Sequence, residues 1–135
     1  MNIGPKKRET LWNFNYIYLL ILSALTSTAF QMISPVVSKF AVTLGAGLTI
    51  AGAITGVFSI TALVVRSFSG VIADRFNKKW IMVCSTIVIA FSVLCYSFAG
   101  SVTALLAFRV VHGIAFALSG TTNMAFASTF IPKDR

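Results

Sequence analysis

Four polar side chains lie within long apolar stretches of this sequence and could contact a solute or a proton there. Arg109, His112 and Asn123 share one helical face, and Gln31 recurs at helical spacing with serines of an earlier stretch. A guanidinium in lipid-spanning sequence costs at least about 2.5 kcal/mol unless water or a counter-charge meets it. We therefore expect Gln31 and Arg109 to face one aqueous cavity and to contact the same polar ligand, with His112 and Asn123 on the same pathway.

Each of these residues also has a simpler interpretation. Arg109 could extend to the outer membrane surface, because its long side chain can climb several ångströms. Gln31 could make a single interhelical hydrogen bond worth about 1 kcal/mol. His112 could be a neutral hydrogen-bonding group and not one that titrates.

The sequence contains no residue pattern typical of an enzyme active site or of a metal site. No set of His, Cys or carboxylate residues has metal-ligand spacing, and no nucleophile can be paired with a base. Cys84 and Cys95 fall on one predicted helix with about 16 Å of rise between them, which is beyond disulfide reach. We expect no enzyme, no metal and no cofactor.

The elements that position the polar residues follow from composition. The chain has 135 residues, of which 57% are hydrophobic and 10% are charged. Soluble domains average about 25% charged residues, so this composition excludes an ordinary soluble protein, and its apolar character excludes disorder. About 20 apolar residues of helix cross a bilayer core, so we predict an all-α membrane fold of four transmembrane helices, with Pro35 ending the first. The predicted spans are 14–33, 44–73, 80–98 and 103–126.

The Lys and Arg residues are placed as in a membrane protein and not as in a nucleic-acid-binding one. Most of them lie near the two chain ends or in the turn after the second span, and the turns on the other side hold only Lys39. By the positive-inside rule, both chain ends are cytoplasmic and the spans cross the cell membrane, plasma or inner. We expect a cytoplasmic N-terminal segment over 1–13, a transmembrane bundle over 14–126 and the start of a cytoplasmic loop over 127–135. The first span also resembles a secretory signal, but three spans follow it, which favours an uncleaved helix.

Small residues recur at helical spacing on two of the predicted helices. Helices in lipid associate by close packing, which small residues allow. The stripe on the second span continues to a charged turn, so we expect that face to slide or lock against another helix; ordinary tight packing is the alternative. The glycines of these packing faces are Gly52, Gly56, Gly113 and Gly120.

The turn between the second and third spans holds the most specific motif of the chain. Asp74 lies near a predicted helix C-terminus, where the helix dipole disfavours an anion, so we expect it to meet a cation or the N-terminus of another helix. Gly70, one turn earlier, would let that helix approach. The motif consists of Gly70, Asp74, Arg75, Lys78 and Lys79.

This turn resembles the signature of the major facilitator superfamily of secondary transporters, Gly-x-x-x-Asp-Arg-x-Gly-Arg-Arg/Lys. Asn77 replaces the second glycine, and asparagine also tolerates a left-handed backbone. The fourth span is similar to the Arg-x-x-Gln-Gly motif of proton-coupled antiporters of that family; Arg109 and Gly113 match, and His112 stands in place of Gln. The resemblance covers the whole chain, as the first four helices of that fold.

The resemblance implies a secondary active transporter that moves a small organic solute by alternating access, with proton-coupled efflux as one mode. It also implies that the first and fourth helices line a central cavity, that the second rocks against the other half, and that the Asp-Arg turn latches the cytoplasmic side. Transporters of this kind have two six-helix halves. Four helices would therefore be a fragment, whose partners are the missing helices of the same transporter, the solute, protons and the lipid bilayer.

Two other membrane functions compete with this one. Small multidrug exporters also have four helices, but they carry a membrane-embedded glutamate on the first, whereas the one glutamate here, Glu9, precedes the membrane. A small membrane assembly or interaction subunit, whose small-residue stripe binds partner helices, is the alternative to a transporter.

Overall fold

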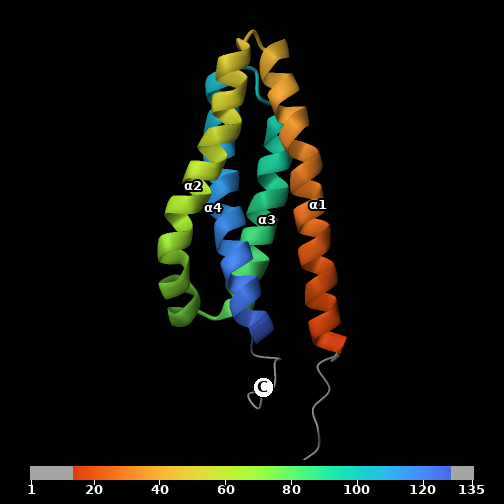
Figure 1. Cartoon of the computed structure of the whole chain (residues 1–135), viewed down its shortest axis with the longest axis vertical. Helices are drawn as coiled ribbons and strands as arrows, with labels where there is room; N and C mark the ends of the chain where they lie inside the picture. The colour runs from red at the N-terminus through yellow and green to blue at the C-terminus, as the bar shows by residue number, and fades with distance from the viewer. Residues whose placement is uncertain (1–13, 129–135) are drawn as a thin grey trace, which may run out of the picture.

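The computed structural model describes residues 14–128, which form four helices running antiparallel along one long axis (Figure 1). The predicted segment 1–13 and most of the predicted loop 127–135 lie outside the described residues. Below, the terminal end is the end of the bundle where the first helix begins, the fourth helix ends and the chain turns from the second helix to the third. The opposite end, with the other two turns, is called the hairpin end. The helices are α1 (Phe14–Thr43), α2 (Leu48–Arg75), α3 (Lys78–Tyr96) and α4 (Val102–Ala127).

All four helices are long and apolar enough to cross a membrane. The shortest, α3, has 19 residues, which corresponds to about 28 Å of helix and matches a bilayer core. The longer α2 has 28 residues and a length of about 42 Å, so part of it extends beyond the hydrocarbon core. The prediction of an all-α membrane fold with four transmembrane helices is confirmed.

The prediction that Pro35 ends the first helix is wrong. Helix α1 continues through Pro35 to Thr43 and has 30 residues. Proline removes one backbone donor, but in an apolar environment every other backbone group still has to be paired, and continued helix is the way to pair them. After the proline, Ser38 Oγ lies 2.7 Å from Thr55 Oγ1, so this last part of α1 also forms a hydrogen bond with α2.

The turn after α1 delays the start of the second helix from the predicted residue 44 to Leu48. Gly45 adopts a left-handed backbone, with φ of 91°, which an L side chain rarely tolerates. The Ala46 N–H donates to the Ala41 carbonyl at 3.0 Å and closes the end of α1. The glycine therefore reverses the chain within a few residues and sets α2 antiparallel to α1.

Helix α4 is the central element, because α2 and α3 both pack along it. Gly113 permits the close approach of α2: a methyl group at this position would lie 3.1 Å from the Phe58 carbonyl oxygen and 3.2 Å from Thr61 Cβ. Toward the hairpin end, Ile54 and Leu105 are fully buried in an apolar core. These contacts hold α2, α3 and α4 together as one packed unit.

Helix α1 packs less extensively on this unit than α2 or α3 packs on α4. It lies against α2 at the hairpin end and diverges from it toward the terminal end, where α4 and α3 lie between them (Figure 1). Phe30 forms the contact halfway along α1, stacking on Phe58 of α2 with ring centroids 4.5 Å apart and lying 4.8 Å from Phe116 of α4. The divergence of α1 beyond this aromatic contact leaves room between α1 and α4.

Candidate solute cavity and buried arginine

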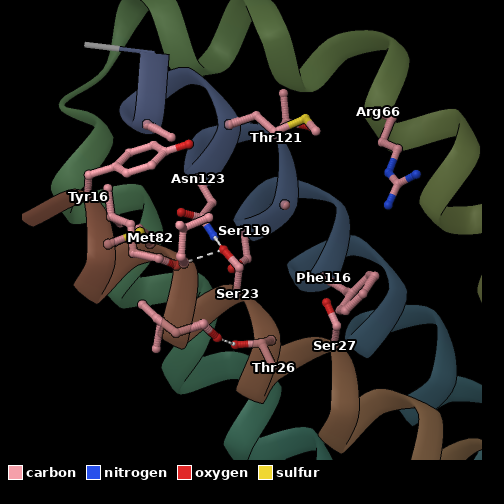
Figure 2. A pocket seen from close by; sticks show the side chains of 16 residues that line it. Tyr16, Ser23, Thr26, Ser27, Arg66, Met82, Phe116, Ser119, Thr121 and Asn123 are labelled. Carbon is pink, nitrogen blue, oxygen red and sulfur yellow. Dashed lines mark hydrogen bonds between the residues drawn. The ribbon is translucent and has the colours of Figure 1, made fainter. Parts of the chain in front are cut away.

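A cavity of about 630 Å³ lies between α1 and α4 in the terminal half of the bundle. Arg66 of α2 and Met82 of α3 also line it, so all four helices contribute (Figure 2). The cavity begins on the terminal side of the contact between Phe30, Phe58 and Phe116, and Phe116 lies at its border. Its volume falls within the range of about 300–1,000 Å³ that small-molecule pockets occupy.

Hydroxyl groups of α1 and one amide of α4 form the polar wall of this cavity. Ser23 and Thr26 donate to carbonyls of their own helix, at 2.8 and 2.7 Å. Asn123 Nδ2 donates to Ser23 Oγ and so connects α4 to α1 across the cavity (Figure 2). The Oδ1 atom of Asn123 is buried and accepts no hydrogen bond from any described residue.

Several donors in the cavity are free to contact a bound molecule. The side chains of Arg66, Ser27 and Ser119 make no hydrogen bond or ion pair with residues 14–128; the Ser69 hydroxyl donates to the backbone carbonyl of Arg66 and leaves its guanidinium free. Tyr16 is likewise without a hydrogen-bond partner within that range, and Figure 2 shows its ring on the opposite side of the cavity from Arg66. Apolar side chains such as Leu19, Leu22 and Met124 complete the wall. The cavity can therefore solvate the polar part of a solute and cover its apolar part.

Arg109 lies in a different environment, in the hairpin half of α4. Its side chain is fully buried, and its Nε, Nη1 and Nη2 atoms make no hydrogen bond with the described part of the chain. The guanidinium carbon lies 5.3 Å from the Phe58 ring centroid and 5.7 Å from the Tyr96 ring centroid. Cation–π contact of this kind stabilises a desolvated charge by about 2 kcal/mol, which offsets only part of the cost of its burial.

His112 is held beside Arg109 by a hydrogen bond to α3. Tyr96 Oη lies 2.8 Å from His112 Nδ1, and both side chains are buried. The imidazole also meets the Phe58 ring edge to face, with centroids 5.3 Å apart. The bond fixes the orientation of the imidazole, so Arg109, His112 and Tyr96 form one rigid cluster across α3 and α4.

The structure brings together only part of the predicted pathway. Of its four residues only Asn123 lines the cavity, since Arg109 and His112 are enclosed by α2, α3 and the rings around them. Gln31 is exposed on α1 and does not line the cavity either. The four helices therefore form no common cavity for Gln31 and Arg109, because the cavity lies in the terminal half and Arg109 lies in the hairpin half. Their contact with a ligand stays a prediction for the complete protein.

Residues that the sequence did not single out contribute much of the cavity. Arg66 resembles Arg109 in the sequence, as a lone cation in an apolar stretch, and only the fold shows that it borders the cavity. Thr121 accepts a 2.8 Å hydrogen bond from Ser69 of α2, which fixes that wall. Helical spacing of the serines in α1 was a usable signal, because Ser23 and Ser27 both line the cavity.

The turn of the sequence motif lies at the terminal end, with Asp74 and Arg75 exposed in the last turn of α2. Asn77 does not use the left-handed backbone that asparagine tolerates, since its φ is −66°. It caps α3 instead, and its side-chain oxygen accepts the Lys79 backbone N–H at 3.1 Å. The turn is thus stable without the second glycine of the motif and leaves Asp74 accessible.

The glycines of the predicted packing faces separate into two groups. Gly113 is in close contact with α2, whereas a methyl group at Gly52, Gly56, Gly70 or Gly120 would meet nothing within 4 Å. The small-residue face of α2 thus points away from the other described helices. A packing role for that face requires helices outside this four-helix unit.

Comparison with known proteins identifies the family. The sequence model of the Major Facilitator Superfamily matches residues 19–135. The chain belongs to this superfamily. An uncharacterized MFS-type transporter of Methanocaldococcus jannaschii is 30% identical over 121 residues, which are 90% of this chain and 31% of that protein. No solved structure matches the chain.

This superfamily member therefore spans about a third of the length of the curated relative that it matches. The four membrane-crossing helices agree with the multi-pass membrane location of the superfamily. The likeness of the turn and of the fourth helix to superfamily motifs is consistent with the match, which extends from α1 to the end of the chain.

Proposed function

We propose that the chain is part of a secondary active transporter that moves a small organic solute by alternating access. The observation that supports this most directly is the cavity of about 630 Å³ between α1 and α4, mostly apolar with a few polar groups, in a member of the major facilitator superfamily. These are the two helices that the resemblance assigns to the central cavity. We assign Asn123 to the solute pathway, and we retain Gln31, Arg109 and His112 as pathway residues of the complete protein.

The rest of the transporter would cover the surfaces that the four helices leave open. The face of α2 with Gly52, Gly56 and Gly70 has no close neighbour among the described residues, and small residues permit close helix contact. We propose that this face packs against the other half of the transporter and moves relative to it.

The motif at the terminal end would act as a conformational latch. Asp74 and Arg75 are exposed, so both are available to a neighbouring helix. An anion at a helix C-terminus is disfavoured unless a cation or a helix N-terminus compensates it. We propose that Asp74 contacts such a group of the other half in the outward-facing state. In the same motif, Gly70 would allow the neighbouring helix to approach, and Lys78 and Lys79 would add positive charge to the turn.

For the coupling and the orientation we propose proton-coupled export, with both chain ends on the cytoplasmic side of the plasma or inner membrane. The export mode is supported by the likeness of Arg109 and Gly113 to the antiporter motif. The orientation is supported by Arg75, Lys78 and Lys79 at the terminal end, opposite the hairpin end with Lys39. Export that persists after a protonophore collapses the proton gradient would refute the coupling.

The transport function is testable with the complete transporter in proteoliposomes and a panel of labelled small solutes. We expect counterflow of at least one solute, and its loss when Asn123→Leu replaces the amide of the cavity wall by an apolar group. Thr86→Leu is the matched control, since Thr86 is exposed on α3 and does not line the cavity. Absence of counterflow for the whole panel, or full activity of the Asn123 variant, would refute the proposal.

A further inference from the structure

Arg66 is the one charged side chain on the cavity wall. It projects from α2 toward the space between α1 and α4, and Figure 2 shows it apart from the Ser23–Asn123 contact. No carboxylate within residues 14–128 pairs with it, because Asp74 is the one acidic residue there and forms no ion pair. Among residues 14–128, nothing compensates this positive charge on the cavity wall.

The neutral hydroxyl groups of the cavity can donate to the same solute as Arg66, and each of them can also accept a hydrogen bond. Tyr16, Ser27 and Ser119 each have a hydroxyl donor that no described residue accepts. The available acceptor with no donor is Asn123 Oδ1. A guanidinium has five N–H donors and no acceptor. The hydroxyls can therefore meet donors or acceptors of a solute, whereas the Arg66 guanidinium is satisfied only by acceptors.

The buried charge of Arg109 adds to the same field. It lies on α4 beyond Phe116, and it is also without a carboxylate partner in the described helices. Charges interact more strongly in a low-dielectric interior than in water, so the guanidinium of Arg66 on the wall and that of Arg109 farther along α4 both make the potential of the cavity more positive. A cationic solute would be repelled, and an anionic one attracted.

We propose that the cavity beside Arg66 selects a small organic anion, whose carboxylate binds the Arg66 guanidinium while its apolar part contacts Phe116, Leu19 and Met82. A carboxylate can bind a guanidinium through two parallel hydrogen bonds, which gives both affinity and orientation. This inference rests on the proposed transport function and adds the charge of the solute.

The test compares three probes of similar size that differ in charge: benzoate, benzamide and benzylammonium. Binding to the purified complete transporter is measured by calorimetry. We expect benzoate to bind roughly tenfold more tightly than benzamide, as for a charge-assisted hydrogen bond, and benzylammonium more weakly than both. Arg66→Gln should abolish the preference for benzoate, and Arg66→Lys should retain part of it.

Lys39→Gln is the matched control, because it removes one positive charge from an exposed site of α1 outside the cavity. It should leave the preference for benzoate unchanged. The melting temperature of each variant without probe shows whether the fold is kept. Absence of benzoate binding, equal binding of the three probes, or a benzoate preference that survives Arg66→Gln in a folded protein would overturn the inference. Solute counterflow, measured separately, distinguishes this failure from failure of the transport function.

Discussion

Arg109 is the residue whose burial is hardest to explain by stability alone. Its guanidinium is enclosed by the Phe58 and Tyr96 rings and makes no hydrogen bond in the described structure. The side chain is fully buried, so it does not extend to the membrane surface, which was the simpler interpretation of its position. An unpaired buried charge destabilises a protein, and its retention is therefore expected to serve function.

We predict that Arg109→Met abolishes transport and raises stability. Methionine fills a similar volume without charge, and replacing buried ionic groups by apolar ones has stabilised proteins by about 1–4 kcal/mol. Transport is measured in proteoliposomes, and stability is measured by thermal unfolding of the solubilised transporter. Arg109→Ala should also abolish transport and still insert into the membrane. Normal transport by the methionine variant would contradict a functional role for the charge.

The Tyr96–His112 hydrogen bond connects α3 to α4 next to this charge. Tyr96→Phe removes the 2.8 Å contact and leaves His112 Nδ1 without its partner. Interhelical hydrogen bonds of membrane proteins contribute about 0.6 kcal/mol on average and up to about 1.7. We predict a loss of stability in this range, measured by unfolding in mixed detergent. An unchanged stability would indicate that water replaces the hydroxyl.

At the scale of the helices, the contact of α2 with α4 depends on one glycine. Gly113 is the one described glycine whose added methyl group would meet neighbouring atoms, at 3.1 and 3.2 Å. Both neighbours belong to α2, and one is the backbone oxygen of Phe58, which cannot move without the helix. Gly113 thus sets the distance between α2 and α4 at the level of the cluster formed by Arg109, His112 and Tyr96.

We predict that Gly113→Ala destabilises the transporter by about 1–3 kcal/mol, the usual cost of inserting a methyl group into a packed interior. Gly120→Ala on the same helix is the control, because nothing lies within 4 Å of its added methyl group. That variant should be neutral or slightly stabilised, since alanine favours helix over glycine. Equal effects of the two substitutions on thermal unfolding would show that the close contact is not the cause.

Helix number and order could be predicted from the sequence because length and hydropathy determine them. The end of α1 could not, since the local penalty of Pro35 is outweighed by the need to pair backbone groups in an apolar environment. The site was predicted in part. Helical spacing indicated the serine face of α1 and Asn123 of α4. The depth at which α1 diverges from α2 depends on the contact of Phe30, Phe58 and Phe116, which joins three helices.

At the scale of the whole molecule, a packed unit of α2, α3 and α4 stands beside a less tightly held α1. The cavity lies in the same half of the bundle as the Asp74 turn. A latch at this end would act on access to the cavity and not on its wall, because Asp74 does not line it. Access and binding are therefore expected to respond to different residues.

We predict that Asp74→Asn slows the transport cycle with little change in solute affinity. The carboxylate is exposed, so its replacement by an amide leaves the four-helix packing intact. Turnover and equilibrium binding are measured on the same transported solute in the complete protein. A loss of affinity at normal turnover would contradict the latch.

If the chain is part of a transporter, we expect water and solute to reach the space between α1 and α4 from the terminal end. The direct measurement is labelling of single cysteines by a charged, membrane-impermeant thiol reagent in membrane vesicles, after Cys84 and Cys95 have been replaced by serine. Ser27→Cys lies on the cavity wall, and Leu25→Cys lies on the exposed apolar surface of the same helix. We predict rapid labelling at 27, protection by the transported solute, and little labelling at 25. Labelling of neither position, or of both at equal rates without protection, would contradict it.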